Sequence, residues 1–71
     1  MFRKRWTFKV DGSFGLFRSP DGEARGPFCR SKNEAILAMR QKINGGLIPR
    51  EESESLFRQI SRSKLPEEIQ L

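Results

Sequence analysis

The fold is decided by residues 28–46, which read FCRSKNEAILAMRQKINGG. Ser31 and Glu34 have the spacing of a capping box, in which the serine oxygen accepts an amide N–H of the first helical turn and the glutamate bonds back to the serine amide. The apolar residues that follow recur at helical spacing and form one stripe; they are Ala35, Ile36, Met39 and Ile43. Asn44-Gly45-Gly46 then ends the pattern, because asparagine and glycine tolerate the left-handed backbone that terminates helices. The stretch predicts one amphipathic helix.

Three segments before this helix are typical of strands. Apolar and polar residues alternate in residues 2–10, with Phe2, Trp6, Phe8 and Val10 on one side and Arg3, Arg5, Thr7 and Lys9 on the other. Asp11-Gly12 and Ser19-Pro20-Asp21-Gly22 are turn sequences. Residues 14–18 and 23–28 are therefore predicted to form the second and third strands.

A second helix is predicted after the first. Pro49 suits a first helical turn, and the glutamates between residues 51 and 54 crowd that turn, where the helix dipole favours negative charge. A narrow apolar stripe follows; it consists of Leu56, Phe57 and Ile60. These signals predict a helix from Pro49 to about residue 62, and Pro66 closes it.

Together these elements predict an α+β fold: a three-stranded antiparallel sheet packed on one helix, plus a C-terminal helix. Residues 1–46 supply the sheet and the capped helix, and residues 47–71 supply the connector, the second helix and an acidic tail of the same domain. Leu16 and Phe17 are neighbours in the second strand and must face opposite ways; we expect Leu16 inside and Phe17 outside. The expected core residues are Trp6, Phe8, Val10, Leu16, Phe28, Ile36, Met39 and Ile43. Leu37 lies off the main stripe of the first helix, where we expect the second helix to dock.

Charge is unevenly placed along the 71 residues. The net charge is +5; residues 1–50 hold eleven Lys and Arg against four Asp and Glu, a balance of +7, and residues 51–71 hold three against five, a balance of −2. A basic body with an acidic end indicates a polyanionic partner, shielding of that body by the tail, or both. A merely solvated surface is the alternative.

Composition argues against catalysis and metal binding. The chain has no histidine, the usual general acid or base at neutral pH, and its one cysteine forms neither an internal disulfide nor a zinc site of about four ligands. Cys29 has no base to activate it, so we expect it to be a buried apolar residue. We therefore expect a non-enzymatic domain with no catalytic residue, metal or cofactor. The lone thiol and the lack of a span of about 20 apolar residues favour a cytoplasmic protein that does not enter a membrane.

The outward cations of the strands define a first candidate site, for nucleic acid. Its cations are Arg3, Lys4, Arg5, Lys9, Arg18 and Arg25. Neighbours on adjacent strands lie about 5 Å apart, so these side chains can form one basic sheet face. The outward Phe17 would lie among them, where cations grip phosphates while the ring stacks on a base or sugar. The alternative is that Phe17 packs under the second helix and that the cations only solvate the face.

Two further surfaces are candidates. Arg30 and Lys32 flank the start of the first helix, where free amide N–H groups and the helix dipole suit a phosphate; an ordinary capped helix start is the alternative. The stripe of Leu56, Phe57 and Ile60 either completes the core or offers a helix for docking into a groove. Since a chain this short buries only about 60% of its unfolded surface, pairing with a second copy is one way to complete the core.

The order of elements through residues 6–43 resembles two DNA-binding modules, the plant apetala-type domain and the amino-terminal domain of some tyrosine integrases. The resemblance covers about half of the chain and rests on an aromatic first strand, Gly26-Pro27-Phe28, and the Ser31 and Glu34-Ala35 helix start. It implies that the three-stranded sheet enters the major groove. The residues that it implies for base contacts are Arg5, Lys9, Arg18 and Arg25, with Trp6 as a reader.

The leading prediction is therefore a small basic domain that binds nucleic acid, DNA first, through a cationic sheet face. The alternative is a small protein-binding regulator or inhibitor, phage-encoded or an accessory factor, that docks on a larger protein through its C-terminal helix or a sheet edge.

Overall fold

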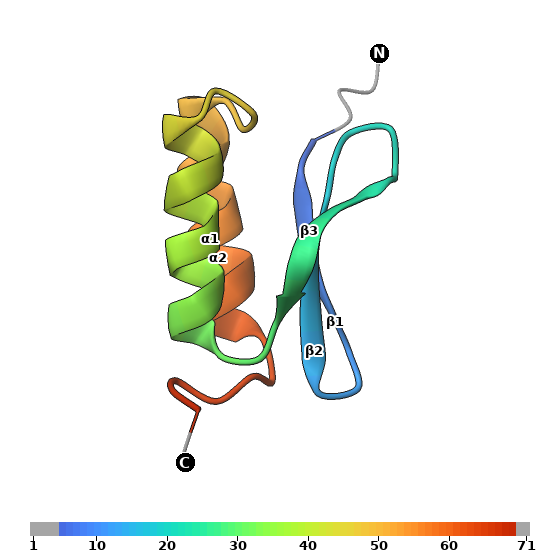
Figure 1. Cartoon of the computed structure of the whole chain (residues 1–71), viewed down its shortest axis with the longest axis vertical. Helices are drawn as coiled ribbons and strands as arrows, with labels where there is room; N and C mark the ends of the chain where they lie inside the picture. Colours follow the sequence, from blue (N-terminus) through green and yellow to red (C-terminus); the bar gives the residue numbers. More distant parts are fainter. Residues whose placement is uncertain (1–4, 70–71) are drawn as a thin grey trace.

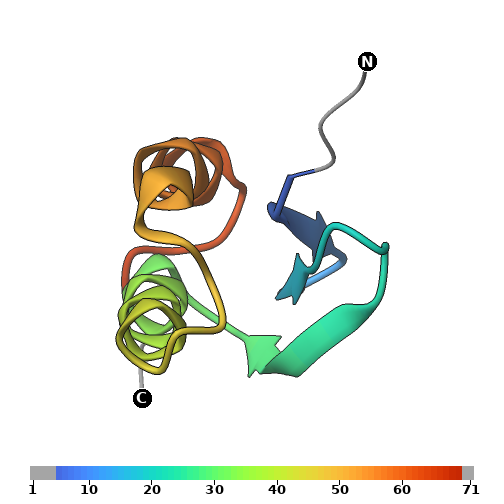
Figure 2. The same ribbon diagram turned by 90° about the horizontal axis from the view of Figure 1, so that it is seen from above.

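The structure of the protein is a computed structural model that describes residues 5–69. Its elements are β1 (Thr7–Asp11), β2 (Phe14–Arg18), β3 (Ala24–Cys29), α1 (Lys32–Asn44), the short 3-10 helix η1 (Arg50–Glu52) and α2 (Ser53–Arg62). The strands form an antiparallel sheet in the order β1-β2-β3. Both helices lie on the same face of this sheet, as Figures 1 and 2 show from two directions, and within the described residues the opposite face is left open. The predicted α+β fold is confirmed.

Helix α1 begins where its capping sequence predicts. The Ser31 side chain accepts the Glu34 amide N–H at 3.1 Å. The Glu34 carboxylate accepts the amide of Arg30 at 2.7 Å, one residue before the expected partner. At the other end Gly46 has φ 82°, a left-handed conformation that glycine adopts without strain. A side-chain cap at the start and a left-handed glycine at the end therefore mark the limits of this helix.

The register of β1 and β2 corrects the expected orientation of two side chains. A two-residue loop with Gly12 at φ 65° joins the strands and places Phe8 opposite Phe17. Directly opposite residues share a face of the sheet, so Phe17 points inward with Phe8; it is fully buried, and the two ring centroids lie 5.0 Å apart. The expectations that Phe17 faces outward and that Leu16 belongs to the core are wrong.

Space for the Phe8 ring comes from Gly15. A Cβ atom at Gly15 would clash with that ring, so this position of β2 admits no side chain while Phe8 stays where it is. The missing side chain lets an aromatic pair, Phe8 and Phe17, fill the centre of the sheet's inner face.

The core draws on both halves of the chain. Its buried apolar residues are Trp6, Phe8, Phe17, Cys29, Ala35, Met39, Ile48, Leu56, Ile60 and Leu65. Val10, Ile36 and Ile43 lie only partly buried at its margin. Phe28, an expected core residue, is 61% exposed.

The C-terminal helix differs from the prediction in its start and in its docking. Pro49 precedes the 3-10 turn η1, and α2 itself begins at Ser53. It packs against α1 and β1, while α1 packs against β3. Leu37, the expected docking position, is 58% exposed, so that expectation is wrong. No helix in residues 5–69 has the length and apolar character required to cross a lipid bilayer.

Candidate nucleic-acid interface

The face of the sheet turned away from the helices is the candidate interface. We call it the open sheet face; its residues are Thr7, Lys9, Asp11, Phe14, Leu16, Arg18 and Phe28. The side chains alternate, so these residues are the neighbours of the inward-facing Phe8, Gly15, Phe17 and Cys29. Since both helices lie on the other side, this face meets solvent (Figure 2).

An exposed aromatic pair occupies one end of the open sheet face. The centroids of Phe14 and Phe28 lie 5.4 Å apart with ring planes at 45°, and the side chains are 44% and 61% exposed. An irregularity in the pairing of β2 with β3 sets Cys29 opposite Gly15, so Cys29 is buried and Phe28 turns outward beside Phe14. Gly26 has φ 89° within this irregular segment, a conformation that suits glycine.

Lys9 and Arg18 supply positive charge to the same face. Lys9 is exposed and lies opposite Leu16. Arg18 lies two residues after Leu16 on β2, so both side chains point to the same face. The Arg18 guanidinium also donates a 2.9 Å hydrogen bond to the carbonyl of Gly22. Asp11, opposite Phe14, brings a carboxylate to the edge of this surface.

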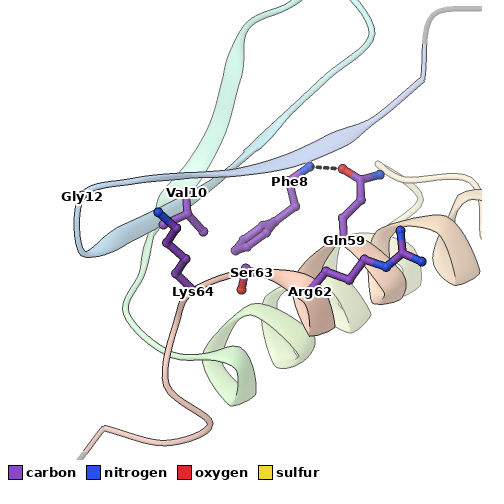
Figure 3. Close-up of a pocket in the computed structure, with 7 residues that line it drawn as sticks. All are labelled: Phe8, Val10, Gly12, Gln59, Arg62, Ser63 and Lys64. Atoms are coloured by element: carbon purple, nitrogen blue, oxygen red, sulfur yellow. Dashed lines mark hydrogen bonds between the residues drawn. The ribbon is translucent and has the colours of Figure 1, made fainter.

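Two adjoining hollows extend the surface around the β1–β2 turn. The first lies between β1 and the end of α2 and is lined by Phe8, Val10, Gly12, Gln59, Arg62, Ser63 and Lys64 (Figure 3). The second is lined by Gly12, Ser13, Phe14, Arg30, Lys64, Leu65, Pro66 and Ile69. Gly12 and Lys64 belong to both, and Figure 3 shows the Lys64 side chain reaching toward β1 beside Val10. Neither lining includes a carboxylate from the described part of the chain.

We call Arg30, Arg62 and Lys64 the hairpin-end cations. All three are exposed. Within residues 5–69 no ion pair engages them, and the same holds for Lys9. Because Phe14 lines the second hollow, these cations adjoin the exposed aromatic pair.

Several expected site residues lie away from the open sheet face or are engaged by other groups. Arg5 precedes β1 and lines a shallow hollow with Glu51, Glu54 and Arg58, so it has acidic neighbours. Arg25 lies opposite the inward-facing Phe17, so the expectation that it joins the outward face is wrong, and it forms an ion pair with Asp21 at 3.3 Å. This pair belongs to the β2–β3 turn, where the Ser19 hydroxyl donates a hydrogen bond to the Asp21 carboxylate. That hydrogen bond is the main reason why the pKa of Asp21 lies below its usual value. Arg3 and Lys4 lie outside the described residues.

The start of α1 has no free amides for a phosphate within the described chain, which corrects that expectation. The Lys32 and Asn33 amides donate to the carbonyls of Pro66 and Glu67 at 2.7 and 3.1 Å, and Ser31 accepts the next two amides. The Lys32 ammonium donates to the Ser61 carbonyl at 2.9 Å and lies 3.6 Å from the Glu67 carboxylate. The C-terminal segment thus occupies this helix start with its own carbonyl and carboxylate oxygens.

The alternative docking stripe on α2 is largely internal. Leu56 and Ile60 are fully buried, which leaves Phe57 at 49% exposure. The outer edge of β1 is also occupied: the Trp6 amide donates to the Glu52 carboxylate at 3.1 Å, and the Phe8 amide donates to the Gln59 side-chain oxygen at 2.9 Å. Trp6 itself is 4% exposed, which confirms its expected place in the core and leaves its ring unexposed for the base contact that the resemblance implies.

Two features of the described residues concern the Cys29 thiol and possible metal ligands. Burial raises the pKa of the Cys29 thiol, and the nearby Lys42 only partly opposes that effect. A thiol held protonated is a poor nucleophile. Among residues 5–69 no three His, Cys, Asp or Glu side chains gather closely enough to hold a metal ion.

Four residues of this surface were not among the site residues predicted from the sequence; they are Phe14, Phe28, Arg62 and Lys64. A signal for Phe14 was present, because a two-residue loop after Asp11 sets it opposite Asp11 on the outer face. Arg62 and Lys64 stand in the net acidic segment and reach the surface only through tertiary packing.

Comparisons with protein-family models, with curated proteins and with solved structures return no match. The resemblance to three-strand DNA-binding modules therefore stays a prediction.

Proposed function

We propose that this domain binds nucleic acid, without catalysing a reaction, through the open sheet face and the hairpin-end cations. The observation that carries the proposal is a set of exposed cations that no carboxylate of residues 5–69 pairs with; they are Lys9, Arg30, Arg62 and Lys64. Lys9 lies on the face that both helices leave uncovered. Arg30 and Lys64 line the hollow that Phe14 also lines, and Arg62 lines the adjoining hollow between β1 and α2. Phosphates are the natural partners of such cations, and their binding releases counterions.

The salt dependence can be worked from this set. If each of these cations neutralises one phosphate, about four contacts give a slope of log affinity against log salt of roughly −2.8 for a single strand and −3.6 for a duplex. Between about 50 and 200 mM salt the affinity should then fall roughly 50- to 150-fold. DNA is the first probe, because the resembling modules bind DNA.

The test compares two double variants of equal net charge. Lys9→Glu with Arg30→Glu removes two proposed contacts, whereas Arg40→Glu with Arg50→Glu changes exposed residues of α1 and η1. Each pair lowers the net charge by four, from +5 to +1.

Fluorescence anisotropy with a labelled oligonucleotide gives the affinity and its salt slope. We expect the first pair to lose at least tenfold in affinity and about half of the slope, and the second pair to stay within about threefold of the parent. Equal losses in both pairs would show a nonspecific effect of net charge and would refute a site on this surface.

A further inference from the structure

We infer that the nucleic acid is single-stranded and that its unpaired bases stack on the Phe14–Phe28 pair. This inference rests on the proposed function and names the substrate class of the same surface. It starts from the two rings, which stand exposed on the open sheet face with centroids 5.4 Å apart. A phenyl ring has no hydrogen-bond donor or acceptor, so it recognises a base chiefly through its flat face. In a duplex those faces are covered by neighbouring base pairs; in a single strand they are accessible.

The arginines of the sheet support the same conclusion. Reading a duplex in the major groove relies on free arginine or lysine side chains that bond to base edges. Arg18 is bonded to the Gly22 carbonyl and Arg25 is paired with Asp21, so both support the β2–β3 turn. Arg18 is thus engaged, and Arg25 lies opposite the inward-facing Phe17 rather than on the open sheet face. Of these cations in the described residues, only Lys9 therefore stands free on that face, beside two exposed rings.

Charge complements the rings on one side. Arg30 and Lys64 line the hollow that Phe14 also lines, and Lys64 continues into the adjoining hollow with Arg62. A strand whose bases cover the two rings can therefore place consecutive phosphates along the hairpin-end cations. Cations that track a backbone beside aromatic rings are the usual arrangement for binding single strands with little sequence preference.

The experiment measures binding of one oligonucleotide, free and annealed to its complement, to the full chain and to four variants. Phe14→Ala and Phe28→Ala remove the rings, and Phe28→Trp keeps a stacking surface. Phe57→Ala is the matched control, since Phe57 is a similarly exposed phenylalanine on α2. Thermal unfolding checks that every variant is folded, which we expect because all three side chains are substantially exposed.

We expect the single strand to bind at least tenfold more tightly than the duplex. Loss of one ring should weaken single-strand binding about 5- to 150-fold, because stacking on an aromatic side chain contributes about 1–3 kcal/mol per base. Phe57→Ala should bind like the parent. Phe28→Trp should bind like the parent, and its fluorescence should be quenched by the single strand above the constant signal of the buried Trp6.

Other outcomes separate this inference from the proposed function. If both alanine variants keep full single-strand affinity while Lys9→Glu with Arg30→Glu abolishes binding, stacking is refuted and the proposed function stands. Duplex binding equal to or tighter than single-strand binding also refutes it. If neither nucleic acid binds, both proposals fail; a dimer of the parent that Phe28→Ala converts to a monomer would then assign the ring pair to self-association.

Discussion

Phe17→Ala and Phe28→Ala should have opposite consequences for stability, and the contrast tests which aromatic residues face the helices. Phe17 is fully buried, so its removal should leave a cavity that destabilises the fold by about 3–5 kcal/mol. At about 0.05–0.15 kcal/mol per residue, the 71-residue domain has roughly 4–11 kcal/mol of total stability. Phe17→Ala should therefore lower the melting temperature by about 12–40 °C or prevent folding.

Phe28→Ala should have a much smaller effect. The residue is 61% exposed, so about two fifths of its surface is buried; since full burial of a phenylalanine contributes about 1.5–3 kcal/mol, the loss should be about 1 kcal/mol or less. Thermal unfolding followed by circular dichroism, and urea unfolding followed by the fluorescence of the buried Trp6, measure both variants. A loss from Phe28→Ala as large as that from Phe17→Ala would refute the strand register on which the open sheet face depends.

Three further predictions concern single positions. Gly15→Ala should destabilise the domain by about 1–3 kcal/mol in urea unfolding, because the new methyl group would displace the Phe8 ring. Asp11→Asn should raise nucleic-acid affinity about two- to fivefold in the anisotropy assay, without a change in melting temperature, because it removes an exposed carboxylate beside Phe14. Burial raises the pKa of the Cys29 thiol, so its contribution to stability should be fully present below the pKa of the unfolded thiol and should decline as pH rises from there toward the folded pKa. Cys29→Ala should flatten that decline in urea unfolding between neutral and alkaline pH.

Local signals were sufficient for the elements of this fold. The Ser31 and Glu34 cap and the glycines after Asn44 determined α1, and the glycine-containing turns determined the hairpins. The start of α2 was less well determined, since the residues after Pro49 form a 3-10 turn before the α-helix begins at Ser53. A proline followed by acidic residues is compatible with the first turn of either a 3-10 helix or an α-helix.

Side-chain orientation required non-local information. Leu16 and Phe17 are both apolar, so the alternation within β2 does not decide which of them faces inward. The pairing with β1 selects the orientation that buries Phe17. Phe28 turns outward because β3 carries an irregularity near Gly26, which the strand pattern alone does not place.

The sequence predicted a basic sheet face as the candidate site, but it identified only some of the residues of that surface. Lys9 and Arg30 are exposed as expected, whereas Lys32 is engaged by the C-terminal segment. The hydrogen bond from Lys32 to Ser61 joins residues about thirty positions apart in the chain, so no local sequence pattern predicts it. The same applies to Lys64, which the fold brings beside the β1–β2 turn.

The most direct test is to follow the amide chemical shifts of isotope-labelled protein while a single-stranded oligonucleotide is added. We predict that the perturbed amides cluster at residues 14–16, 28–30 and 62–64, with little change at Leu37 and Phe57 on the helical layer. Perturbations centred on that layer, or none at low salt, would contradict the assignment of nucleic-acid binding to the open sheet face.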